Sequence, residues 1–158
     1  MIRNYKEEDF PSLAKIAKLA WKNIFAGYKE QIGPELFGLI FDNKYQDKEY
    51  QLRIFLEKTP EQCLVCERNG KVAGFITFVF DRDRKIGIIG NNAADLSSSE
   101  KGIGQELYAA ALERFRSEGM KTAMVNTGLD SGHERARKAY QRAGFSAHTD
   151  SITYYMKL

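Results

Sequence analysis

Residues 97–107 read SSSEKGIGQEL and place two glycines, Gly102 and Gly104, where an amphipathic helix begins. Apolar side chains recur at four-residue steps from this point, at Ile103, Leu107, Ala111 and Phe115. This period predicts a helix that ends near Gly119. A helix start exposes unpaired N–H groups and a partial positive charge, and glycine lets an anion approach the main chain. The stretch therefore predicts an anion site at a helix N-terminus, with a plain glycine-rich turn as the alternative.

The glycine pair completes neither of two well-known phosphate-binding motifs. Leu107 stands where a dinucleotide-binding loop needs its third glycine, and no Gly-Lys-Ser/Thr follows as it would in a P-loop. The pattern alone therefore leaves the nature of the anion open.

Length, composition and charge exclude several classes of protein. The chain has 158 residues, 43% of them apolar and 28% charged, which fits one folded domain over residues 1–158. A net charge of +3 is too small for a dedicated nucleic-acid binder, so no nucleic-acid partner is expected. The longest apolar run, residues 72–80, is too short to span a bilayer, and the N-terminus lacks the apolar stretch of a signal peptide. We expect a cytoplasmic protein without a membrane partner.

Two cysteines form a CxxC pair at Cys63 and Cys66, a spacing that can indicate redox chemistry or zinc. No second CxxC follows, and the surrounding QCLVCE is typical of a strand. Strand residues three apart point to opposite faces. We therefore predict two buried thiols and no metal.

Two helical regions are predicted in the N-terminal part. From Asp9, a candidate N-cap with Pro11 in the first turn, apolar residues recur at three- and four-residue steps. A second region covers residues 33–58 in two pieces, with Gly-Pro at its start and Thr-Pro after its end.

The middle and the end of the chain have the residues of strands. Asn69-Gly70 is a two-residue hairpin signal between segments rich in Val, Ile and Phe. A last helix, residues 133–142, ends at Gly144. The predicted strands are 1–5, 62–68, 71–80, 86–93, 122–126, 145–148 and 152–157. The first would lie at an edge of the sheet, and the last two would form a closing antiparallel pair.

Residues 133–145, HERARKAYQRAGF, add a second pattern to SEKGIG at 99–104. With both, the sequence resembles the GNAT family of acetyl-CoA-dependent N-acyltransferases. The family signature is Gln or Arg, two residues, Gly, any residue, then Gly or Ala, and Ser99 occupies its first place. His133 occupies the first place of the later family pattern of Asn, Ala, Tyr and Gly-Phe. The resemblance covers residues 86–145.

The resemblance implies a three-layer α/β/α fold of the α+β class, with a mixed, mostly antiparallel sheet of about six to seven strands and about four helices. The sheet would splay between the strand ending near Ala94 and the strand at 122–126, and acetyl-CoA would enter there as co-substrate. Main-chain groups of residues 92–96 would pair with the pantetheine and hold the acetyl carbonyl, while N–H groups of residues 99–104 would bind the pyrophosphate. The implied cofactor-binding residues are Asn92, Ala94, Leu96, Ser99, Glu100, Lys101, Gly102, Ile103, Gly104 and His133.

Acetyl transfer from a thioester needs a proton donor for the departing thiolate, and the resemblance assigns this role to Tyr140. The pKa of a phenol is about 10, close enough to that of a thiol for proton donation. By helical spacing alone, Tyr140 shares a face with Ala136 and Ala143 and is a core aromatic. The strand before the glycines offers only Asp95, a turn or capping residue, so the sequence names no general base.

The expected acceptor is a primary amine of a small molecule or a peptide. Tyr28 is a candidate for the acceptor mouth, and Asn91 and Asn126 are candidates for holding a water that takes the proton. Trp21 belongs to the apolar stripe and is assigned to the core. The alternative function is a module that binds coenzyme A without turnover, as a sensor or partner domain. A homodimer through the strand SITYYMKL, residues 151–158, is a further expectation.

Overall fold

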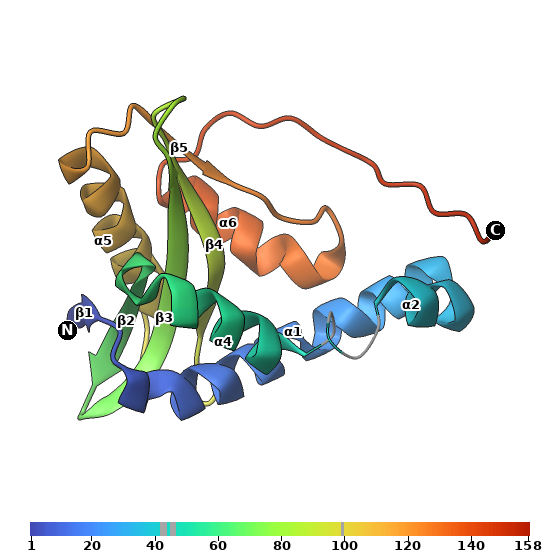
Figure 1. Cartoon of the computed structure of the whole chain (residues 1–158), viewed down its shortest axis with the longest axis horizontal. Helices are drawn as coiled ribbons and strands as arrows, with labels where there is room; N and C mark the ends of the chain where they lie inside the picture. The colour runs from blue at the N-terminus through green and yellow to red at the C-terminus, as the bar shows by residue number, and fades with distance from the viewer. Residues whose placement is uncertain (42–43, 45–46, 99) are drawn as a thin grey trace.

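The computed structural model describes residues 1–41, 44, 47–98 and 100–158 (Figure 1). Within these residues, the strands are β1 (Ile2–Asn4), β2 (Cys63–Arg68), β3 (Lys71–Asp81), β4 (Ile86–Ala94) and β5 (Thr122–Val125). The α-helices are α1 (Phe10–Ile32), α2 (Pro34–Ile40), α4 (Lys48–Lys58), α5 (Ile103–Ser117) and α6 (Glu134–Arg142). Short 3₁₀ helices are η1 (Glu7–Asp9), η2 (Pro60–Gln62) and η3 (Ser131–His133). None of the described helices is long and apolar enough to span a membrane.

The strands form one sheet in chain order, antiparallel from β1 to β4, with β5 parallel to β4. Asn69 and Gly70 join β2 to β3 with φ angles of 52° and 72°, the two positive values of a type I′ hairpin turn. The predicted hairpin and the predicted N-terminal edge strand are confirmed.

Helices cover both faces of the sheet and create two cores. α1 and α4 pack on one face, and α5 and α6 pack on the other, which confirms the three-layer prediction. Cys63 belongs to the first core and Cys66 to the second, as expected for strand residues three apart. Both thiols are free and buried, and burial raises the pKa of the Cys63 thiol to about 12. Neither cysteine is therefore a reactive thiolate.

The sheet separates at its β5 end. β4 pairs with β5 from Ile86 to Ile89 and then continues to Ala94 beside β3. At the point of separation, Gly90 and Asn91 together oppose the single residue Thr77 of β3, which makes a β-bulge. A Cβ on Gly90 would lie 2.7 Å from the Thr77 hydroxyl, so this position has no room for a side chain. The β5 ladder thus ends before β4 does, at the place where the sheet is predicted to splay.

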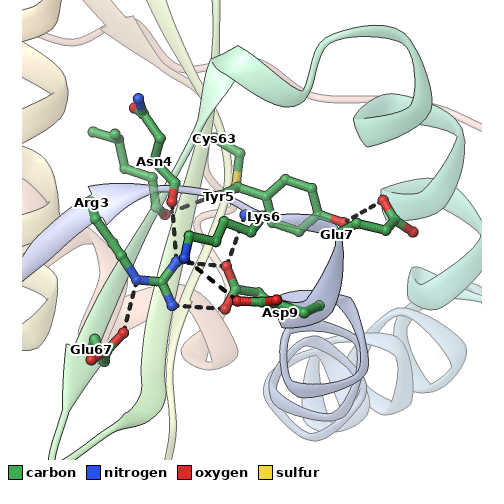
Figure 2. Close-up of polar contacts among 10 residues, drawn as sticks. Arg3, Asn4, Tyr5, Lys6, Glu7, Asp9, Cys63 and Glu67 are labelled. Carbon is green, nitrogen blue, oxygen red and sulfur yellow. Dashed lines mark hydrogen bonds and ion pairs between the residues drawn. The ribbon is translucent and has the colours of Figure 1, made fainter.

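Arg3 ties the N-terminal strand to the rest of the fold (Figure 2). Its guanidinium donates two hydrogen bonds to the Asp9 carboxylate, at 2.7 and 2.8 Å, and its Nε donates one of 2.8 Å to Glu67 on β2. The Asp9 side chain is only 5% exposed, and the hydrogen bond from Arg3 holds the pKa of that carboxyl below its usual range.

Asp9 occupies the predicted N-cap position of α1, but its carboxylate makes no capping hydrogen bond to that helix. It accepts instead from Arg3 and from the Lys6 backbone N–H (Figure 2). The predicted cap is therefore replaced by an ion pair.

Two predicted strands are wrong. Residues 145–148 and 152–157 have no regular structure, so the described residues contain five strands rather than six to seven, and five α-helices rather than four. The segment runs away from the sheet toward α2, where Lys157 contacts Glu35 (Figure 1). Ile152, Tyr154 and Met156 are all exposed. β-branched and aromatic residues favour a strand, but a strand forms only against a partner that completes its ladder.

Candidate active site

Three side chains from three elements meet just beyond the point where β4 and β5 separate. The Asn92 side-chain amide on β4 donates a hydrogen bond of 3.1 Å to the Tyr140 hydroxyl on α6. The Tyr108 hydroxyl on α5 donates one of 2.8 Å to the Asn92 side-chain oxygen. The two tyrosine rings lie 5.3 Å apart between centroids. Asn92 donates to the Tyr140 oxygen, so this hydrogen bond does not use the phenolic hydrogen of Tyr140.

The surroundings keep this phenol protonated. Tyr140 is buried, and burial raises its pKa, while the hydrogen bond from Asn92 and the neighbouring Tyr108 hydroxyl act in the opposite direction. Burial also raises the pKa of Tyr108. Both phenols are therefore neutral near pH 7, and Tyr140 has the proton that an acid needs. The alternative from helical spacing, a core aromatic, also describes its burial.

The helix α5 has Gly102 as its N-cap, and no capping hydrogen bond from a side chain is found there among the described residues. Gly102 has a φ of +84°, a left-handed conformation that favours glycine. A Cβ on Gly104 would meet one ring carbon of Tyr108 at 3.7 Å, which is an ordinary contact, so packing does not require glycine there. The Ile103 side chain is buried in the core. The main chain of Ile103 and Gly104 is thus what this helix start can present to an anion.

Charges near this helix start are partly balanced by Arg68 on β2, which forms ion pairs with Glu100 and Glu106. Lys101 is exposed. Ser99, the first residue of the predicted motif, lies outside the described residues.

Among the described residues, no strand pairs with the second edge of β4 from Asn92 to Ala94. Asn92 and Ala94 pair with Ile76 and Gly74 of β3, while the β5 ladder ends at Ile89. An extended ligand can therefore pair with this second edge. Leu96 is exposed beyond the strand.

Asp95 makes a turn, as predicted, because its carboxylate accepts from the N–H and hydroxyl of Ser97.

His133 and Tyr28 lie together at the other end of α6. Their rings are stacked with centroids 6.3 Å apart, and His133 Nδ1 is 2.6 Å from the Asp130 carboxylate. Burial raises the pKa of Tyr28. Asn126 is exposed just after β5. These three predicted site residues are not in contact with the Asn92 group within the described residues.

Asn91 points to the opposite face of the sheet from Asn92. Its side-chain oxygen accepts a hydrogen bond of 3.2 Å from Lys48 Nζ. Lys48 stands in the first turn of α4, which starts there because the Asp47 carboxylate accepts the N–H groups of Glu49 and Tyr50. Sequence reasoning missed Lys48, since a contact across 43 residues has no local signal.

A shallow hollow of about 440 Å³ lies on the α4 face, between α4 and the end of β3. It is lined by Gln51, Ile54, Phe55, Lys58, Thr59, Gln62, Val79 and Phe80. None of its lining residues belongs to the Asn92 group or to the start of α5, so the candidate active site does not lie in this hollow. The described residues contain no group of three or more His, Cys, Asp or Glu side chains able to hold a metal ion.

A sheet that separates beside an uncapped helix start and a buried phenol fits an enzyme that handles an acyl thioester with a phosphorylated carrier. Residues 21–145 match the family model described as the Acetyltransferase (GNAT) family. The match covers most of the chain, and the protein belongs to this family of acetyl-CoA-dependent acetyltransferases. A search of curated proteins gave no significant match.

Solved structures show the same fold. PaiA N-acetyltransferase from Thermoplasma acidophilum, in complex with coenzyme A, has a TM-score of 0.69 and 19% identity over 95% of this chain and 92% of that chain. Ribosomal-protein-alanine N-acetyltransferase from Brucella melitensis has a TM-score of 0.65 and 21% identity over 92% and 84%. An aminoglycoside acetyltransferase from an uncultured soil metagenomic sample, in complex with sisomicin, has a TM-score of 0.58 and 18% identity over 100% and 95%.

Proposed function

We propose that this protein is an N-acetyltransferase that moves the acetyl group of acetyl-CoA to a primary amine of a small molecule or peptide by direct attack. The observation that carries the proposal is the hydrogen-bonded group of Tyr108, Asn92 and Tyr140 at the separation of β4 and β5.

In this reaction the acceptor nitrogen forms a bond to the thioester carbonyl carbon, and the carbon–sulfur bond breaks. The thiolate takes the phenolic proton of Tyr140, while the nitrogen loses one proton to a base. Tyr140 suits the acid role because it is buried, protonated and oriented through its oxygen by Asn92.

The residues present fit coenzyme A as co-substrate. The uncapped start of α5 offers main-chain N–H groups of Ile103 and Gly104 to the pyrophosphate, with Gly102 leaving the approach open. The free edge of β4 from Asn92 to Ala94 offers main-chain partners to the pantetheine. Ser99, Glu100, Lys101, Leu96 and His133 complete the proposed coenzyme site.

For the acceptor, we propose the amine class without a narrower choice, with Tyr28, Asn91 and Asn126 as candidate contacts. The names of similar structures include a ribosomal-protein alanine and an aminoglycoside as acceptors of those proteins. This range supports testing both peptides and small amines.

Thiol release from acetyl-CoA tests the proposal with four amines: an alanyl peptide, a lysyl peptide, spermidine and sisomicin. We expect release with at least one, and loss of that release in Tyr140→Phe. Calorimetry with coenzyme A runs in parallel. Heat of binding without thiol release from any of the four amines would contradict the proposal and favour a non-catalytic coenzyme-binding module.

A further inference from the structure

On the basis of the proposed function, we propose that the side-chain amine of Lys48 accepts the proton that the acceptor amine loses during acetyl transfer. The sequence names no general base for this site. Within the described residues, no carboxylate contacts Asn91 or Asn92. Lys48 is the amine that reaches β4 at this point, through the side chain of Asn91.

The contacts of Lys48 leave room for a lone pair. Its Nζ donates a hydrogen bond of 2.8 Å to the Gln51 side-chain oxygen and one of 3.2 Å to the Asn91 side-chain oxygen. The Trp21 ring lies below it, with Nζ 4.7 Å from the ring centroid. A neutral amine has two N–H groups, so it keeps both hydrogen bonds and still offers its lone pair to a proton.

Lys48 and Tyr140 are attached to neighbouring residues on opposite faces of β4. Asn91 reaches Lys48 on the α4 face, and Asn92 reaches Tyr140 on the α6 face. This division suits direct attack, because the proton acceptor must reach the incoming nitrogen and the proton donor must reach the departing sulfur. The bulge at Gly90 lies immediately before the two asparagines.

Burial favours the neutral form of this amine. It lowers the pKa of Lys48 to about 8, so about a tenth of the molecules carry a neutral amine at pH 7 and about half at pH 8. The Trp21 face favours the ammonium and provides a partner for the charged form after proton transfer.

The charged side chains described beside Lys48 on α4 and beside Trp21 on α1 have other partners or lie in solvent. Within the described residues, the groups that touch Lys48 Nζ are two amides and an indole. The charged side chains nearest to Lys48 along α4, and to Trp21 along α1, are those of Asp47, Glu49, Lys18 and Lys22. The Asp47 carboxylate accepts helix N–H groups, and Glu49 pairs with Arg53 at 3.9 Å. Lys18 and Lys22 are exposed.

With Lys48 as the base, every proton in the reaction has a donor and an acceptor. The nitrogen–carbon bond forms, the carbon–sulfur bond breaks, Lys48 gains the proton from nitrogen, and the thiolate gains the proton of Tyr140. Water then removes the proton from Lys48 and returns one to Tyr140 before the next turnover.

Two substitutions separate proton acceptance from charge and packing. Lys48→Met keeps the length of the side chain without the amine, and Lys48→Arg keeps a cation that does not deprotonate near neutral pH. We expect both to lower kcat on the order of 10²-fold with the amine that the wild type acetylates, and both to remove the acidic limb near pH 8 from the kcat profile. Lys58→Met, at the exposed other end of α4, is the matched control and keeps the wild-type profile.

Either of two kinetic results would overturn the role of Lys48 while leaving the proposed function intact: Lys48→Met with the wild-type limb and rate, or Lys48→Arg with the wild-type rate. Circular dichroism and thermal unfolding identify a variant that has lost its fold. For such a variant, the pH dependence of acetic anhydride labelling at Lys48 in the wild-type protein decides the role of Lys48.

A measurement without an acceptor tests the amine itself. Wild-type protein is labelled with a trace of acetic anhydride at each pH, and mass spectrometry follows the peptide containing Lys48. We expect a labelling midpoint near pH 8, and a midpoint above about pH 10 would overturn the inference alone. A wild-type protein that binds coenzyme A but acetylates none of the four amines contradicts the proposed function, and the role of Lys48 is rejected with it.

Discussion

The side-chain amide of Asn92 on β4 holds the Tyr140 hydroxyl of α6 with a hydrogen bond of 3.1 Å. The other end of the same amide accepts the hydroxyl of Tyr108 on α5 at 2.8 Å. One asparagine thus connects the strand beside the gap with both helices on that face, and it fixes the orientation of the phenol without using its hydrogen.

Removal of the Tyr140 hydroxyl is predicted to affect turnover far more than binding. Tyr140→Phe keeps the ring in its core position but removes the proton donor, so kcat should fall on the order of 10²-fold or more. Calorimetry should find the affinity for coenzyme A nearly unchanged. Unchanged turnover would return Tyr140 to a purely structural role.

The support from Asn92 can be separated from that of Tyr108. Asn92→Ala removes the amide that bonds to both hydroxyls, so it should cost about 1–3 kcal/mol of unfolding free energy and lower kcat about tenfold. Tyr108→Phe removes one donor and should lower kcat less. Urea unfolding and steady-state kinetics measure these effects, and a larger kinetic loss in Tyr108→Phe than in Asn92→Ala would contradict this order.

Gly104→Ala tests the helix start as a phosphate site. The added methyl meets only an ordinary contact with Tyr108, so folding should be retained, while the affinity for coenzyme A should fall about tenfold because the methyl obstructs the approach to the main chain. Gly27→Ala in α1, where a Cβ meets no atom within 4 Å, is the control and should bind coenzyme A normally. Equal affinities in the two variants would argue against binding at this point.

The ion pair of Arg3 and Asp9 predicts a pH-dependent stability. The lowered pKa of Asp9 means that its contribution is present above about pH 4 and is lost as the pH falls through the folded-state pKa. Arg3→Met leaves a buried carboxylate unpaired and should cost about 2–3 kcal/mol at pH 7, with a smaller loss at pH 3.

Urea unfolding at both pH values checks this expectation. Arg116→Met, which removes an exposed pair with Glu113, should change stability much less at either pH. An equal loss for Arg3→Met at pH 7 and pH 3 would show that packing rather than charge is responsible.

Elements with a local signal could be predicted from the sequence. Asn69-Gly70 specifies its hairpin through two positive φ angles, and Gly119 and Gly144, both with positive φ, follow helices that end where expected. The segment after Phe145 has strand residues but no ladder partner in this structure, so propensity alone was misleading there.

The site was predictable to the extent that motifs describe it. The anion site at the α5 start came from its glycines and the role of Tyr140 from the resemblance, and the conformation of Gly102 and the burial of Tyr140 fit those interpretations. The hydrogen bonds of Asn92 and the contact of Lys48 with Asn91 depend on how distant elements pack, which neither periodicity nor spacing reports.

The β-bulge on β4 adds one residue that the pairing of β3 with β4 does not need. Between the pairs formed by Ile76 and Phe78, β3 has one residue and β4 has two. A chain lacking Gly90 would restore regular alternation, and Ile89, Asn91 and Asn92 would each stay on the side of the sheet where they lie now. The sheet could therefore be built one residue shorter. In the proposed reaction, that extra glycine stands just past the end of the β5 ladder, at the place where the thioester would enter.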